Sequence, residues 1–122
     1  MDERVVQALK RDRTVDITTV GRRTGLPRRI EIWFHNLDGK IYITGTPGPR
    51  SWYANLVVNP EFTFHIKGSV QADLPARAVP VIDKARRRDI LSQILPRLGE
   101  QDELEPWVEG SPLVEVTFQI EG

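Results

Sequence analysis

Hydrophobic and polar positions alternate along most of the chain with the two-residue period of a β-strand. The β-branched run over residues 14–20 predicts a first strand, and the alternation resumes after Pro27, where Ile30, Ile32 and Phe34 share one face. Asp38-Gly39 predicts a hairpin into a return strand over residues 40–46. Further strands are predicted over residues 62–66, 69–79 and 113–120. The pattern therefore indicates about six antiparallel strands.

Three short segments carry apolar residues at helical spacing instead. They cover residues 2–11, residues 52–58 with Ser51 as the N-cap, and residues 83–95, followed by Pro96 and Gly99 as stop signals. The acidic stretch over residues 100–109 predicts a loop across the surface, with Trp107 as its apolar anchor.

Strands linked by hairpins, together with three short helices, predict a mainly β fold. Closing the sheet removes exposed strand edges, so we expect a small barrel with the helices packed at its rims. A length of 122 residues fits one domain, spanning residues 1–122.

Composition narrows the class of protein further. The chain has no cysteine and two histidines, which excludes disulfides and thiolate ligands, and we expect no metal site. No apolar run is long enough for a membrane span, and the N-terminus lacks the layout of a signal peptide, so a cytoplasmic location is expected. Basic and acidic residues number 17 each, which disfavours nucleic acid as the partner.

The first candidate site is the turn Gly21-Arg22-Arg23-Thr24-Gly25 between two predicted strands. Its glycines allow close backbone approach, and its arginines and threonine offer charged donors and a hydroxyl, with Arg28 just beyond. This pattern suits a phosphate or a carboxylate. The alternative is a hairpin whose arginines only keep an edge soluble.

The second candidate site is the Gly- and Pro-rich loop over residues 45–50, with the helix that follows it. Free N–H groups at the helix start, beside Trp52 and Tyr53, are suited to a flat ring that carries polar groups. The alternative is a connector in which Trp52 only fills the core.

Three other polar residues, His35, His65 and Glu31, are interpreted as structural rather than catalytic. His35 and His65 are expected on the surface, because the spacing places no acidic partner near either. Glu31 is expected to pair with Arg29. No catalytic residue is assigned.

Three signatures follow one another in a fixed order: Thr18 to Gly25, then Asp38-Gly39 with Gly45-Thr46-Pro47-Gly48, then Trp52 to Pro60. This series resembles the deazaflavin-dependent nitroreductase family, over most of the chain from about Thr14 to Phe118. The resemblance implies a split β-barrel of the FMN-binding type, related to pyridoxamine phosphate oxidases, and coenzyme F420 as the cofactor.

The resemblance also assigns roles to residues of this chain. Arg22, Arg23, Thr24 and Arg28 would hold the phosphate and oligoglutamate tail of F420. Thr44, Gly45 and Thr46 would line the deazaflavin ring, with Trp33 and Trp52 near it. The chain departs from the family pattern at Ile30-Glu31-Ile32-Trp33, where many members have a proline and a small apolar residue.

The leading hypothesis is an F420-dependent oxidoreductase that passes a hydride to a small, planar, electron-poor acceptor such as a quinone or a nitroaromatic compound. One alternative keeps the barrel and binds FMN instead. Another is a non-catalytic module that binds an anionic ligand or a nucleic acid. Because such barrels often pair, Trp33, His35 and the edge of residues 62–66 form a candidate homodimer interface.

Overall fold

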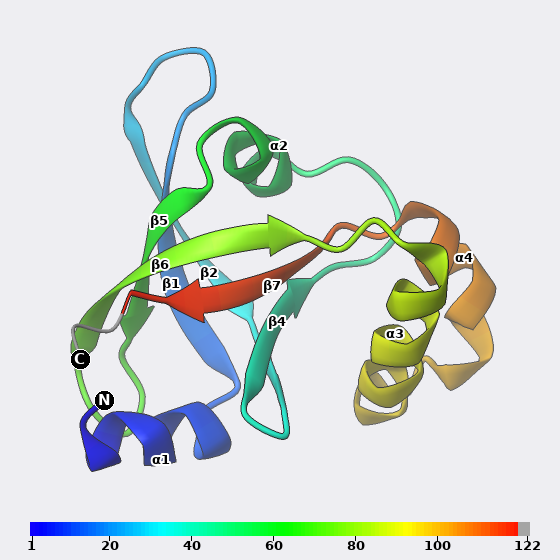
Figure 1. The fold of residues 1–122 in the computed structure, drawn as a ribbon, viewed down its shortest axis with the longest axis horizontal. Helices are drawn as coiled ribbons and strands as arrows, with labels where there is room; N and C mark the ends of the chain where they lie inside the picture. Colours follow the sequence, from blue (N-terminus) through cyan, green and yellow to red (C-terminus); the bar gives the residue numbers. More distant parts are fainter. Residues whose placement is uncertain (120–122) are drawn as a thin grey trace.

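Seven antiparallel strands form one sheet in the computed structural model, which describes residues 1–119 (Figure 1). They are β1 (Thr14–Val20), β2 (Pro27–Trp33), β3 (His35–Leu37), β4 (Lys40–Thr44), β5 (Glu61–Ile66), β6 (Ala72–Pro80) and β7 (Leu113–Phe118). The strand order is β2-β1-β5-β6-β7-β4-β3, and β2 also contacts β4, so the sheet curls into a half-barrel. The predicted mainly β fold is confirmed.

The strand count exceeds the prediction because the segment after Pro27 is divided at Phe34. There the Phe34 N–H donates to the carbonyl of Arg13 at 2.9 Å, outside the strand ladder, and the buried Phe34 ring points into the core. The last strand is described as far as Phe118, and Ile120 lies outside the described residues.

The three predicted helices are confirmed as α1 (Glu3–Arg11), α2 (Ser51–Val58) and α3 (Lys84–Leu98). Two of their ends differ from the prediction. Ser51 is the first residue of α2 rather than its cap, because Arg50 occupies the cap position and makes no side-chain cap bond. Helix α3 continues through Pro96 and ends at Gly99, whose φ of 70° suits a residue without a side chain.

The acidic stretch is not a surface loop, and that prediction is wrong. It forms a short 3₁₀ turn (Gln101–Glu103) and a further helix, α4 (Leu104–Gly110). Leu104, Trp107 and Val108 recur at helical spacing and pack against α3, which fixes the helix despite the surrounding acids. Trp107 is buried in this contact, so its predicted role as an anchor is confirmed.

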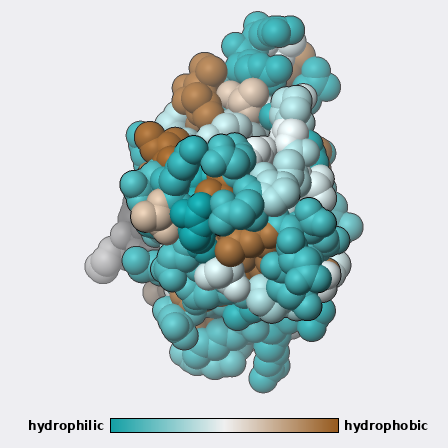
Figure 2. All heavy atoms as spheres, turned by 90° about the vertical axis from the view of Figure 1, so that its right-hand side faces the viewer, coloured by the Kyte–Doolittle hydropathy of each residue, from teal (hydrophilic) through white to brown (hydrophobic). Residues whose placement is uncertain are grey.

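Two hydrophobic clusters hold the fold together. Inside the curled sheet, the Phe64 ring meets Phe34 and Phe118 edge-on, with centroid distances of 5.4 and 5.2 Å. A second cluster forms where α3 and α4 cover the β4 and β7 end of the sheet, at the right of Figure 1. The outer face of that end is mainly hydrophilic, with scattered apolar side chains (Figure 2).

The outer face of β1, β2 and β5 carries a charged network that differs from the predicted Glu31–Arg29 pair. Arg29 instead donates to Asp16 at 3.0 Å, and Glu31 pairs with Lys67. The register places Asp16 opposite Glu31, so Lys67 reaches both carboxylates. Lys67, followed by Arg29, lowers the pKa of Asp16 below its usual value.

Residues 62–66 do not form an edge of the sheet, contrary to the prediction, because β5 lies between β1 and β6. His35 is buried, whereas Trp33 lies on the edge strand β2 with 48% of its surface exposed. Within residues 1–119, no helix has both the length and the apolar character that crossing a membrane requires.

Candidate functional site

The arginine turn between β1 and β2 is held by its own backbone. The Gly21 N–H donates to the Leu26 carbonyl at 2.8 Å, and the Gly25 N–H donates to the Gly21 carbonyl at 2.9 Å. A Cβ on Gly21 would lie 2.6 Å from the Thr24 hydroxyl oxygen and 3.3 Å from the Leu26 carbonyl oxygen, so a larger residue there would displace the Thr24 side chain. The Thr24 hydroxyl accepts from the Leu26 N–H. The turn is therefore rigid at its base, while its arginine side chains are exposed.

Helix α2 is fixed beside this turn by the loop that precedes it. The Arg50 guanidinium donates to the Thr46 carbonyl at 3.0 Å, to the Thr46 hydroxyl at 2.5 Å and to the Pro49 carbonyl at 2.9 Å. The Gly48 N–H donates to the Gly110 carbonyl at 3.0 Å, which ties the loop to α4. These bonds fix where α2 begins, and so where Ser51 and Trp52 lie.

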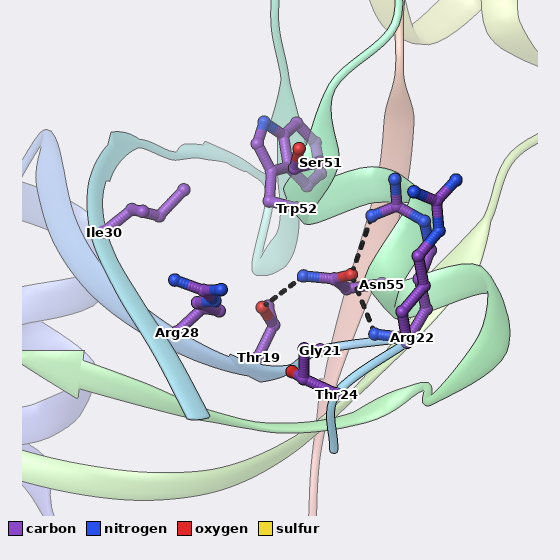
Figure 3. Close-up of a pocket in the computed structure, with 10 residues that line it drawn as sticks. Thr19, Gly21, Arg22, Thr24, Arg28, Ile30, Ser51, Trp52 and Asn55 are labelled. Atoms are coloured by element: carbon purple, nitrogen blue, oxygen red, sulfur yellow. Dashed lines mark hydrogen bonds between the residues drawn. The ribbon is translucent and has the colours of Figure 1, made fainter. Parts of the chain in front are cut away.

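The turn and the helix border one cavity of about 440 Å³, a size typical of small-molecule sites. Figure 3 shows Arg28 and Ile30 from β2 facing Ser51 and Trp52 from α2 across this space. The lining residues are Thr19, Gly21, Arg22, Arg23, Thr24, Arg28, Ile30, Ser51, Trp52 and Asn55. Charged donors thus lie beside an indole and an aliphatic side chain.

The cavity is strongly cationic. Half of the other ten arginines form ion pairs with carboxylates: Arg4, Arg29, Arg77, Arg86 and Arg88. Among residues 1–119, no carboxylate lies within ion-pair distance of Arg22, Arg23 or Arg28. Three guanidinium groups with no anionic partner favour a ligand that carries negative charge.

The structure brings together five of the nine residues expected to bind the cofactor: Arg22, Arg23, Thr24, Arg28 and Trp52 all line this cavity. The other four lie elsewhere. The Thr44 hydroxyl donates to the Pro112 carbonyl at 2.6 Å, Gly45 lies beside the Pro112 ring, and Thr46 accepts from Arg50. They shape the loop before α2 rather than the cavity wall.

Trp33 lies at the other end of the β1–β2 hairpin. It pairs with Thr14 in the register, whereas the turn lies beyond the pair of Val20 and Pro27. At about 3.3 Å per residue, Trp33 lies roughly 20 Å from the turn and roughly 10 Å along the strand from Ile30, the nearest cavity-lining residue on β2. Trp33 borders a different depression, next to the end of α1.

Both histidines are buried, so their predicted surface positions are wrong. His65 lies between the Thr18 hydroxyl and the Asp73 carboxylate, with both hydrogen-bond distances 2.7 Å. The sequence spacing gave no acidic partner because Asp73 reaches His65 across the β5–β6 ladder. His35 is only 6% exposed, and burial, helped by the charge of Arg97, lowers its pKa to about 4.

The depressed pKa of His35 predicts a loss of stability in mild acid. The unfolded chain takes up a proton on this side chain near pH 6.5, whereas the folded protein does so only near pH 4. The contribution of neutral His35 to the free energy of unfolding is therefore complete above pH 6.5. It decreases as the pH falls toward 4, by about 3 kcal/mol in total. Urea unfolding of the wild type and of His35→Phe between pH 7 and 4 measures it. The variant is expected to lose less stability, and parallel losses would contradict this assignment.

Gly21 lines the cavity as part of the predicted turn, whereas sequence reasoning assigned no binding role to the side chains of Thr19, Ile30, Ser51 and Asn55, which also line it. Asn55 is the most informative, because it is 5% exposed on the buried face of α2. The sequence does carry a signal for it, because Asn55 shares the apolar helix face of Trp52 and Leu56. A polar side chain at such a buried position requires hydrogen-bond partners.

Comparison with known proteins gives the following relatives. The model of a family described as F420H(2)-dependent quinone reductase matches residues 1–103. A conserved hypothetical protein from Mycobacterium tuberculosis superposes with a TM-score of 0.75 at 19% identity, over 98% of this chain and 82% of the other.

Two further solved structures share the fold. An F420 reductase superposes with a TM-score of 0.68 at 17% identity, over 93% of this chain and 92% of the other. A putative pyridoxamine 5'-phosphate oxidase from Listeria innocua superposes with a TM-score of 0.70 at 13% identity, over 95% of this chain and 91% of the other. These likenesses confirm the split-barrel fold that the sequence predicts.

Proposed function

Because the chain belongs to the F420H(2)-dependent quinone reductase family, and is therefore an oxidoreductase that uses coenzyme F420, we propose that it reduces a planar, electron-poor acceptor of the quinone or nitroaromatic type. Bound F420 in its reduced form supplies the hydride for this reaction. The protein has to bind and orient the two molecules and to exclude water.

The observation that carries this proposal is that three arginines with no carboxylate partner among residues 1–119 converge with the Trp52 indole on one cavity. Arg22, Arg23 and Arg28 match the phosphate and the carboxylates of the cofactor tail, because guanidinium groups bind such anions bidentately. Ile30 and Trp52 offer apolar surface to the flat ring. The residues present therefore fit the cofactor.

Two further residues, Thr24 and Ser51, add hydrogen-bond donors to the two parts of the cavity, the arginine side and the apolar side. The Thr24 oxygen accepts a backbone N–H, which leaves the hydroxyl proton free to donate to the tail. Ser51 begins α2 beside Trp52, where the helix has no side-chain cap, so that its first N–H groups are free for polar edges of the ring.

A steady-state assay tests the choice of acceptor. The protein is mixed with reduced F420 and either menadione or a nitroaromatic compound of similar size, and the return of F420 fluorescence gives the rate. We expect oxidation that depends on both protein and acceptor. Oxidation at the uncatalysed rate with both acceptors would contradict the proposal, and yellow purified protein with flavin absorbance would support FMN instead.

A further inference from the structure

Asn55 connects the arginine turn to helix α2 through three hydrogen bonds (Figure 3). Its amide oxygen accepts from the Arg22 backbone N–H at 3.1 Å and from Arg22 Nη1 at 3.0 Å. Its amide nitrogen donates to the Thr19 hydroxyl at 3.3 Å. One buried side chain thus holds both the backbone and the guanidinium group of Arg22.

We propose that Asn55 is a positioning residue that sets the affinity for the anionic part of F420 by holding Arg22 in its binding orientation. This inference rests on the proposed function and deepens it. An exposed arginine normally samples many rotamers, and a ligand that orders it loses binding free energy. Because Asn55 orders Arg22 beforehand, that entropic cost is reduced.

The tether leaves Arg22 able to bind an anion. An arginine carries five N–H donors, and the bond to Asn55 uses one of them at Nη1. The remaining donors include both hydrogens on Nη2, and the side chain lines the cavity. Asn55 is neutral, so it orients the guanidinium without cancelling its charge.

The same tether links the two halves of the cavity. Asn55 lies one helical turn after Ser51 and Trp52 on α2, and a helix transmits position rigidly over one turn. Arg22 is therefore held at a fixed place relative to the indole. A ligand that has its anionic group at Arg22 finds the apolar wall already in position.

Asn59 provides a matched control. It follows the last turn of α2, and its amide nitrogen donates to the Val20 carbonyl of the same hairpin at 3.3 Å. It therefore also ties α2 to the hairpin, but it neither touches Arg22 nor lines the cavity. A general loosening of the helix from the hairpin would appear in both Asn59→Ala and Asn55→Ala.

The experiment measures F420 binding by fluorescence titration for Asn55→Ala, Asn59→Ala, Arg22→Ala and the Asn55→Ala/Arg22→Ala double variant. We expect Asn55→Ala to raise Kd about tenfold and Asn59→Ala to leave it within about twofold. In the Arg22→Ala background, Asn55→Ala should have almost no further effect. Equal effects of Asn55→Ala in the two backgrounds would overturn the proposal.

Amide hydrogen exchange in the ligand-free protein gives a second readout, independent of cofactor binding. Asn55→Ala should speed exchange at the Arg22 amide, whereas the Gly21 amide, bonded to Leu26, should stay protected. Protection of Arg22 in the variant, or equal loss at both amides, would contradict positioning by Asn55. If the alanine variant does not fold, Asn55→Asp replaces it, because an aspartate keeps the oxygen that accepts from the Arg22 N–H and from Nη1. In Asn55→Asp the Arg22 amide should stay protected from exchange. Fast exchange of that amide would count against the proposal.

The two readouts separate failure of this inference from failure of the proposed function. If wild-type protein does not bind F420 while Arg22 exchange responds to Asn55→Ala, the proposed cofactor site fails and the tether remains. If F420 binds and its Kd is unchanged by Asn55→Ala, the positioning role fails and the proposed function remains.

Discussion

Replacing Arg22, Arg23 and Arg28 together by alanine is expected to weaken F420 binding by roughly a thousandfold. Each guanidinium group supplies charge-assisted hydrogen bonds worth about 1.5–3 kcal/mol to an anion, and about 1.4 kcal/mol corresponds to a factor of ten. The three side chains are exposed and form no ion pair with a carboxylate of residues 1–119, and Asn55 keeps the Arg22 backbone N–H as a partner, so stability should change by less than about 1 kcal/mol. Fluorescence titration and urea unfolding measure the two effects.

A matched variant removes the same number of charges at a distance from the cavity. Arg11, Arg13 and Lys40 are exposed, lie outside the cavity lining and form no ion pair with a carboxylate of residues 1–119. Their replacement by alanine should change Kd by less than about threefold, through long-range electrostatics that salt screens. If both triple variants lose affinity equally, overall charge rather than the arginine turn determines binding.

The largest effect on stability is expected for Arg87→Met, at about 3–5 kcal/mol. The Arg87 guanidinium is buried and donates to four carbonyls, those of Val81, Trp107, Val108 and Ser111, at 2.6–3.2 Å. Methionine fills much of the space but donates nothing, so all four carbonyls lose this donor, and only that of Trp107 keeps another within residues 1–119, the Ser111 N–H at 3.0 Å. The contacts join α3 to α4 and to the start of β7.

Arg86→Met is the control for this prediction. Arg86 precedes Arg87 on the same helix but is partly exposed and pairs with Glu115, so its loss should cost less than about 1 kcal/mol. Urea unfolding followed by tryptophan fluorescence, to which the buried Trp107 contributes, compares the two variants. A loss below 1 kcal/mol for Arg87→Met would mean that the carbonyl contacts contribute little to stability.

The sequence pattern predicts the strands well because their period directly reflects one buried face. The alternation in β1 buries Val15 and Ile17 as expected, and Asp38-Gly39 forms the hairpin between β3 and β4. Helix α4 was missed because its charge dominated the interpretation, although Leu104, Trp107 and Val108 already carried helical spacing. In this segment the spacing of the apolar residues predicts the structure better than its acidic composition does.

Residue contacts across strands were beyond what spacing could predict. His65 and Asp73 meet only through the β5–β6 register, and Arg87 is buried while the adjacent Arg86 is partly exposed, which depends on where α4 packs. In the cavity, the residue types needed for anion binding could be read from the turn. The hydrogen bonds from Asn55 to Arg22 could not be predicted, because the two residues are 33 positions apart and meet only where α2 packs beside the β1–β2 turn.

The most direct test of the cofactor site compares F420 with the same deazaflavin chromophore lacking the phosphate and the glutamates. If the arginine turn holds the anionic tail while Trp52 and Ile30 contact the ring, F420 should bind at least about a hundredfold more tightly than the tail-less molecule. That advantage should largely disappear in the Arg22/Arg23/Arg28 triple-alanine variant. Equal affinity of the wild type for the two molecules would contradict the account.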